Sequence, residues 1–177
     1  MKNGLLTVLL ASCATLSAQA PAPSLSGTWQ LDEARSQVAA TAGIIGLIPA
    51  GAPKTLHITQ PANGTVVIES QVNEAHVRIY KPGRETSTPA GQGGAVTMTS
   101  KWAGRSLVSE GAMKAPNGDT TTIREVVAIG ADGKSLTMDV TTTPVGQTEK
   151  VSSSLVYTKI TDVGPCEKWP TPCKKFP

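Results

Sequence analysis

The chain has 177 residues, of which 16 are Lys or Arg and 13 are Asp or Glu, and its formal net charge at pH 7 is +3. Apart from a short basic run near the C-terminus the basic residues are scattered, so the charge distribution does not indicate a nucleic-acid partner. The length that remains after an N-terminal signal is enough for one domain with a hydrophobic core and too short for two. We therefore expect a single-domain monomer that does not bind nucleic acid.

The first segment has the pattern of a secretory signal peptide. Lys2 precedes an apolar run over residues 5–11, and an Ala-x-Ala sequence at 18–20 ends the segment. The apolar run is far shorter than the roughly 20 residues that cross a bilayer, and no later run approaches that length. Residues 1–20 therefore predict export, either to the periplasm or to the medium, without a transmembrane segment.

A second export route stays open on the same residues. The sequence "LASC" at 10–13 resembles the lipobox of bacterial lipoproteins, in which the cysteine becomes the lipidated first residue. Under that alternative the protein is anchored to a membrane through a lipid on Cys13.

After the signal, "SGTWQL" predicts a short strand around Trp29, whose ring we expect to close one end of the fold. The alanine-rich composition from Glu33 to Thr41 predicts one or two short helices. An apolar group follows at 44–48, which we expect to act as a lid or plug; contact with a membrane or a partner is the alternative.

Beyond Pro53 the chain alternates short Val-, Ile- and Thr-rich runs with turns, a pattern typical of antiparallel barrels and sandwiches. The turn signals lie at 63–64, 73–74, 82–83, 103–104, 117–118, 132–133 and 145–146. Residues 86–95 are rich in glycine and small polar residues and predict a mobile loop. Serial hairpins of this kind most simply close on themselves, so we predict an all-β, up-and-down antiparallel barrel of about eight to ten strands with a short helical segment after the first strand.

Period-two alternation within the runs predicts one buried and one wet face. The apolar positions that alternate with polar ones are Leu56 and Ile58, Val66 and Ile68, Val77 and Ile79, Leu136, Met138 and Val140, and Leu155 and Tyr157. In the run around Val77, the polar positions belong to His76 and Arg78, which the pattern places on the wet face.

The C-terminal residues 161–177 form a proline-rich tail with two cysteines, Cys166 and Cys173. In an oxidising compartment these predict a disulfide that closes a loop of about eight residues and contributes roughly 2–3 kcal/mol. A metal or redox site is the alternative, but the spacing is not C-x-x-C and no histidine lies nearby in the sequence.

Four stretches together resemble the secreted lipocalin-like domains of bacteria, which are calycin-type barrels: "SGTWQL", "TSKWAGRSLVSEG", "ADGKSLTMDVTTTP" and "SLVYTK". The resemblance covers residues 25–160. The order of strand, helical connection and serial hairpins also resembles the fatty-acid-binding proteins. The resemblance implies that a small hydrophobic or amphipathic molecule binds inside the barrel.

The resemblance to fatty-acid-binding proteins also implies binding residues. Their ligand carboxylate is held by an arginine in a Thr-Thr-x-x-Arg-Glu strand and by an Arg-x-Tyr pair on the last strand. Here Arg124 and Tyr157 take two of these positions, and Leu155 stands at the third. An interior Arg124 would bind an acidic head group through charge-assisted hydrogen bonds, although the strand pattern allows either face for it. Trp102 and Met138 complete the candidate ligand-binding residues.

Catalysis has little support in the sequence. The two histidines, His57 and His76, alternate with apolar residues and are expected to face water, and no nucleophile-elbow, phosphate-loop, dinucleotide or zinc-protease motif is present. We therefore expect neither an enzyme nor a bound cofactor or metal. Two hypotheses remain, a carrier with an internal cavity and a filled barrel that acts as an interaction module of the cell envelope.

Overall fold

The computed structural model describes residues 22–39, 52–61, 64–72, 74–89 and 94–162, and within strands it leaves the side chains of 71–76 and 89 undescribed. These ranges contain ten strands: β1 (Gly27–Leu31), β2 (Thr55–Thr59), β3 (Val66–Val72), β4 (Glu74–Tyr80), β5 (Glu85–Pro89), β6 (Ala95–Ala103), β7 (Ser106–Lys114), β8 (Thr120–Ile129), β9 (Ser135–Thr143) and β10 (Val151–Thr161). The predicted all-β class and number of strands are confirmed.

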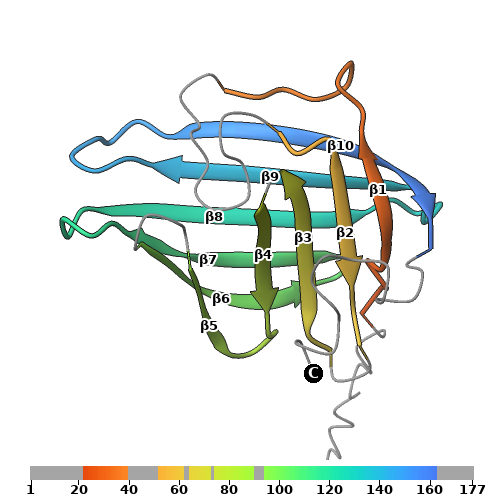
Figure 1. Cartoon of the computed structure of the whole chain (residues 1–177), viewed down its shortest axis with the longest axis horizontal. Helices are drawn as coiled ribbons and strands as arrows, with labels where there is room; N and C mark the ends of the chain where they lie inside the picture. The colour runs from red at the N-terminus through yellow and green to blue at the C-terminus, as the bar shows by residue number, and fades with distance from the viewer. Residues whose placement is uncertain (1–21, 40–51, 62–63, 73, 90–93, 163–177) are drawn as a thin grey trace, which may run out of the picture.

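All ten strands belong to one antiparallel sheet, in the order β4-β3-β2-β1-β10-β9-β8-β7-β6-β5. Strands that follow one another in the chain pair with each other, except β4 and β5, and β1 also pairs with β10. The sheet therefore curls into a nearly closed up-and-down barrel with β4 and β5 at its two ends. Figure 1 shows β2 to β4 lying crosswise over β6 to β9. The interior therefore lies between two halves of one continuous wall.

The turns between strands follow the glycine signals of the sequence. Glycines with positive φ occupy the predicted turns at 64, 83, 104, 118, 133 and 146. In the β8–β9 turn, Gly133 has a φ of 67°, and the Asp132 carboxylate accepts hydrogen bonds from the amides of Lys134 and Ser135. A left-handed residue beside an Asx-type cap is the arrangement that a tight hairpin needs.

The inner face of most strands is the one that alternation predicts. Leu56 and Ile58 on β2 are fully buried, as are Leu136 on β9 and Leu155 and Tyr157 on β10. Trp29 is also fully buried, and its indole Nε1 donates a hydrogen bond to the carbonyl of Leu25 at 3.0 Å. Burial of so large a ring is favourable because its one polar atom has a partner.

Strand β4 reverses the predicted faces. Arg78 and Tyr80 are buried, whereas Val77 and Ile79 are only half-buried. The register decides this outcome, because β3 turns Val66 and Ile68 into the core and these residues pair with Tyr80 and Arg78. Residues that lie opposite one another on paired strands point to the same face of the sheet, so the partners of buried residues on β3 also point into the interior.

The helical prediction is not confirmed within the described residues. From Glu33 to Ala39 the chain forms a turn and then an isolated bridge between Gln37 and Ser154. The amides of Gln37 and Ser154 each donate to the other residue's carbonyl, at 2.7 and 2.8 Å, so β10 satisfies the polar groups that a helix would otherwise pair.

The prediction of a loop over 86–95 is wrong at its start, because β5 covers Glu85–Pro89 and pairs with β6. The apolar group at 44–48, the signal segment with Cys13, and the pair Cys166 and Cys173 lie outside the described residues. Within the described ranges, the structure contains no helix long and apolar enough to cross a bilayer.

Candidate ligand-binding site

A cluster of buried polar side chains lies inside the barrel, between β4 and β8. The Tyr80 hydroxyl donates a hydrogen bond to Glu125 Oε2 at 2.6 Å, and Arg78 Nη2 lies 3.2 Å from Glu125 Oε1. Arg78, Tyr80 and Glu125 are 3%, 1% and 1% exposed, respectively. An acid, a base and a phenol are thus held together out of contact with solvent, and we refer to these three residues as the inner triad.

Strand geometry places Glu125 in this cluster. On β8 the buried residues are Ile123, Glu125, Val127 and Ile129, with exposed or half-buried residues between them. Glu125 pairs in register with Ser109 on β7 and with Val140 on β9, both of which are buried. The carboxylate therefore projects from the middle of an otherwise largely apolar inner face.

Burial makes the inner triad costly unless its charges are paired. Arg78 uses its second terminal nitrogen, Nη1, to approach Met98 Sδ on β6 at 3.0 Å. Desolvation, followed by the nearby Glu125 carboxylate, raises the pKa of Tyr80 well above its usual value, so the phenol stays a hydrogen-bond donor. The acid and the base neutralise one another, but Glu125 Oε1 is buried without a hydrogen-bond partner despite its proximity to Arg78.

Two serines extend the polar region along the wall. Ser100 on β6 and Ser109 on β7 are opposite one another in register, and their hydroxyls lie 2.8 Å apart. Both are buried, and Ser109 is in turn opposite Glu125. A row of polar groups thus crosses three neighbouring strands on the inner face of the barrel.

Arg124, the predicted anchor for an acidic head group, lies on the outer face. Its side chain is 52% exposed, and its Nε is 3.1 Å from Oε1 of Glu110 on β7. The strand pattern allowed either face for Arg124, and the structure has it on the outer one, because β8 takes the parity in which Ile123 and Val127 face the core. The interior charge on this strand is instead the negative one of the next residue, Glu125.

The other three candidates lie at interior positions. Met138 and Tyr157 are buried in the core, and Trp102 packs against that core while half-buried near the end of β6. The Tyr157 hydroxyl donates to the carbonyl of Pro53 at 3.2 Å, and burial raises the pKa of this phenol. Their roles in ligand binding stay predictions.

The pattern of the sequence did not find the inner triad. In "VRIY" the two aliphatic residues, Val77 and Ile79, alternate with Arg78 and Tyr80. This alternation predicted that Val77 and Ile79 are buried and that Arg78 is exposed to solvent. The only available signal was indirect: if Arg124 faced outward, Glu125 had to face inward. A buried carboxylate on β8 requires a basic partner, and the pairing with β4 emerges only from the closed fold.

The histidines form no metal site within the described part of the chain, where no three His, Cys, Asp or Glu side chains group as ligands. His57 is half-buried, its Nδ1 lies 3.0 Å from Thr28 Oγ1, and burial lowers its pKa. The side chain of His76 lies outside the described ones.

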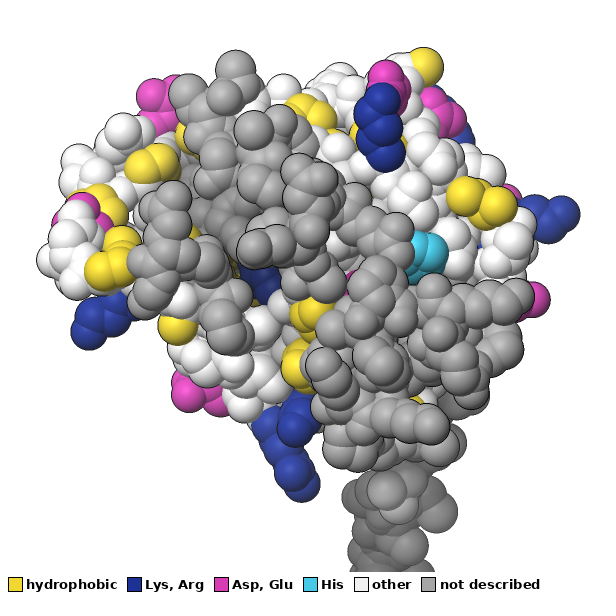
Figure 2. Space-filling model, in the orientation of Figure 1, with side chains coloured by type: hydrophobic (Ala, Val, Ile, Leu, Met, Phe, Trp, Pro, Cys, Tyr) yellow, Lys and Arg dark blue, Asp and Glu magenta, His cyan; other side chains and the backbone are white. Residues whose placement is uncertain are grey.

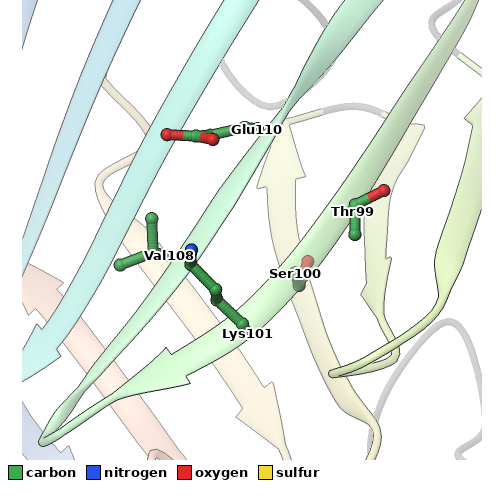
Figure 3. A pocket seen from close by; sticks show the side chains of 5 residues that line it. All are labelled: Thr99, Ser100, Lys101, Val108 and Glu110. Carbon is green, nitrogen blue, oxygen red and sulfur yellow. The ribbon is translucent and has the colours of Figure 1, made fainter.

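Two shallow depressions mark the outer surface of the same wall. One, of about 100 Å³, is lined by Thr99, Ser100 and Lys101 of β6 and by Val108 and Glu110 of β7 (Figure 3). The other, of about 240 Å³, extends from Glu110 and Arg124 towards Lys150. On the face seen in Figure 2, basic and acidic side chains of the described residues are spread over the surface and form no large patch of one charge. These outer features lack the buried, converging polar groups of the interior.

The sequence matches no protein-family model, and no curated protein matches it. Among solved structures, the REP1-NXSQ fatty acid transporter has a TM-score of 0.54 at 14% identity, over 79% of this chain and 98% of that one. Fatty-acid-binding protein 1 of Echinococcus granulosus has a TM-score of 0.52 at 14% identity, over 77% and 98%. Lipid binding protein 8 of Caenorhabditis elegans has a TM-score of 0.51 at 12% identity, over 76% and 94%. The chain therefore has the calycin-type barrel fold that these lipid-binding proteins share, as its sequence predicted.

Proposed function

We propose that the protein is an exported carrier that binds a small hydrophobic or amphipathic molecule inside its barrel. The observation that carries the proposal is the buried polar group of Arg78, Tyr80 and Glu125 within an otherwise largely apolar inner wall. Binding sites for small molecules combine such a lining with a few placed polar groups. The solved structures with the same fold are named as a fatty acid transporter, a fatty-acid-binding protein and a lipid binding protein, which supports a carrier rather than an enzyme.

The size of the inward side chains supports room for a guest. On β6 and β7 the inner positions include Ser100 and Ser109 beside a few larger apolar residues. The whole chain has one Phe, two Tyr and three Trp, so large rings are scarce as a filling for a ten-stranded barrel. Each Å² of apolar ligand surface removed from water would contribute roughly 25 cal/mol to binding.

Export is part of the proposal and rests on residues 1–20, with a lipid anchor on Cys13 as the alternative route. A carrier outside the cytoplasm would benefit from a disulfide between Cys166 and Cys173, which would hold its tail. Mass spectrometry of the mature protein, before and after reduction, reports the N-terminal residue, any lipid and the disulfide together.

The direct test is to purify the mature protein without detergent, extract it with organic solvent and analyse the extract by mass spectrometry. We expect a reproducible small amphipathic molecule in stoichiometric amount. The delipidated protein should then take up N-phenyl-1-naphthylamine, an uncharged fluorescent probe, and release it to the extracted molecule. Blank extracts together with no uptake of the probe would contradict a carrier and favour a filled barrel.

A matched pair of variants locates the binding. Ser100 faces inward and is fully buried, whereas its neighbour Thr99 lies on the outer face and is exposed. Ser100→Phe should therefore reduce uptake of the probe by occupying internal space, and Thr99→Phe should leave it unchanged. In a filled barrel Ser100→Phe would instead be strongly destabilising, because an overpacked core forces the wall apart; thermal unfolding measures this directly.

A further inference from the structure

The inner triad leaves one buried acceptor oxygen without a hydrogen bond, and this defines the ligand more closely. We propose that the barrel selects an uncharged amphipath whose head group donates a hydrogen bond, such as a long-chain alcohol or primary amide, and disfavours the corresponding carboxylate. This inference rests on the proposed function and names the class of ligand.

The first argument is the charge balance of the interior. Among the residues that the structure describes, the buried charges on the inner face are Arg78 and Glu125, which lie 3.2 Å apart and cancel one another. The third buried charged residue, Glu69, pairs in register with His57 and Val77. It therefore points to the outer face of the sheet and not into the barrel. A ligand carboxylate beside the triad would add a second negative charge to one arginine, in surroundings where an uncompensated charge is costly.

The second argument is the hydrogen-bonding capacity of Glu125. Oε2 receives the Tyr80 hydroxyl at 2.6 Å, whereas Oε1 is buried and has no hydrogen-bond partner. Arg78 approaches Oε1 as an ion pair, but its N–H groups are not aligned for a hydrogen bond. A hydroxyl or an amide N–H can supply the missing donor, and an ionised carboxylate cannot, because it has only acceptors.

The third argument is the set of inner residues next to Glu125. Ser109 lies opposite Glu125 on the neighbouring strand and provides a hydroxyl that can donate to a ligand oxygen. Ile123 and Val127 flank Glu125 on the inner face of β8, and Val140 lies opposite it on β9. A head group that both donates and accepts, with an apolar chain behind it, matches this arrangement.

The test compares three ligands with the same chain: tetradecanol, tetradecanamide and tetradecanoate. Each displaces N-phenyl-1-naphthylamine from the delipidated, full-length mature protein at neutral pH. We expect the alcohol and the amide to bind at least about tenfold more tightly than the carboxylate, since the latter meets an unfavourable buried charge. A carboxylate that binds as tightly as the alcohol overturns the inference and leaves the carrier function standing, whereas absence of probe uptake overturns both.

Glu125→Gln reverses the selection that we propose. The substitution removes the negative charge that faces Arg78, so the affinity of tetradecanoate relative to tetradecanol should rise at least about tenfold. Glu110→Gln is the matched control, because it makes the same change in the outer pair with Arg124 and should leave the ratio unchanged. An unchanged ratio in folded Glu125→Gln overturns the inference; if that variant does not fold, the ranking of the three ligands by the native protein decides.

Discussion

Two arginine–glutamate pairs lie on opposite faces of the same barrel wall, and they meet at neighbouring residues of β8. Arg124 points outward and pairs with Glu110, and both side chains are more than half exposed. Glu125, the next residue, points inward and pairs with Arg78, and both are almost fully buried. The two N–O distances, 3.1 and 3.2 Å, are nearly equal.

Equal distances do not make the two pairs equivalent. The outer pair is solvated before and after folding, so its net contribution to stability is small. Folding removes water from the inner pair, which costs free energy. The attraction between the two charges and the Tyr80 hydrogen bond offset this cost only while all three groups are present. The contrast teaches that the face of the strand, rather than the geometry of the ion pair, sets its energetic importance.

Breaking the inner pair should have the largest effect. Arg78→Met leaves the Glu125 carboxylate buried without its counter-ion, and we expect the free energy of unfolding to fall by about 3–5 kcal/mol. Urea unfolding followed by circular dichroism measures the change. Arg124→Met makes the same substitution in the outer pair, and similar losses for the two variants would refute the contrast.

Removing both inner charges sharpens the same comparison. The double variant Arg78→Met/Glu125→Leu leaves no uncompensated charge and should be more stable than Arg78→Met alone. Additive losses in this double-mutant cycle would show that the two groups do not act as a pair.

Tyr80→Phe should have the next largest effect. The variant removes the donor to Glu125 Oε2 and leaves that oxygen unpaired in the core, at a cost of about 1–3 kcal/mol. The same urea measurement applies, with Tyr157→Phe as a comparison, because that hydroxyl donates to a neutral carbonyl instead. The loss should be larger for Tyr80→Phe, and the reverse order would count against a special role of the inner triad.

Alkaline pH should weaken the fold through its interior. Burial raises the pKa of Tyr80 and of Tyr157, the only two tyrosines of the chain. Above about pH 10 the unfolded chain releases phenolic protons that the folded chain retains, so stability is complete below that pH and falls above it by about 1.4 kcal/mol per pH unit for each tyrosine. Tyrosinate absorbance should appear together with unfolding, and its appearance in the folded protein near pH 10 would contradict their burial.

The smallest effect belongs to the outer pair. Glu110→Gln should change the free energy of unfolding by no more than about 1 kcal/mol, and added salt should reduce the difference. Denaturant melts at low and high ionic strength measure it. A loss approaching that of Arg78→Met would mean that the outer face is protected from solvent in the intact protein.

The sequence predicts the strands and turns well, because these depend on local chemistry. Gly133 beside Asp132 specifies a hairpin, and Leu136, Met138 and Val140 specify a buried face, without information from the rest of the chain. The faces of β4 and β8 could not be predicted in this way. Their parity is decided by register with neighbouring strands, and it overrides the apolar alternation of Val77 and Ile79.

The candidate site was predicted only in part for the same reason. Met138 and Tyr157 follow from alternation, and both are buried as it indicates. The inner triad joins residues of β4 and β8, which are 45 positions apart between Tyr80 and Glu125. No local sequence pattern relates residues so far apart, so their contact could be seen only in the three-dimensional structure of the closed barrel.

The two ends of the sheet form the one junction of the barrel wall without a strand pairing among the described strands. Strands β4 and β5 are the two margins of the ladder, so parting them disturbs side-chain contacts rather than the main-chain bonds that hold every other junction. The inner triad ties one of these margins, β4, to β8 on the other side of the barrel. Amide exchange should therefore be fastest along the facing edges of β4 and β5, and substitutions that break the inner triad should speed it further on β4.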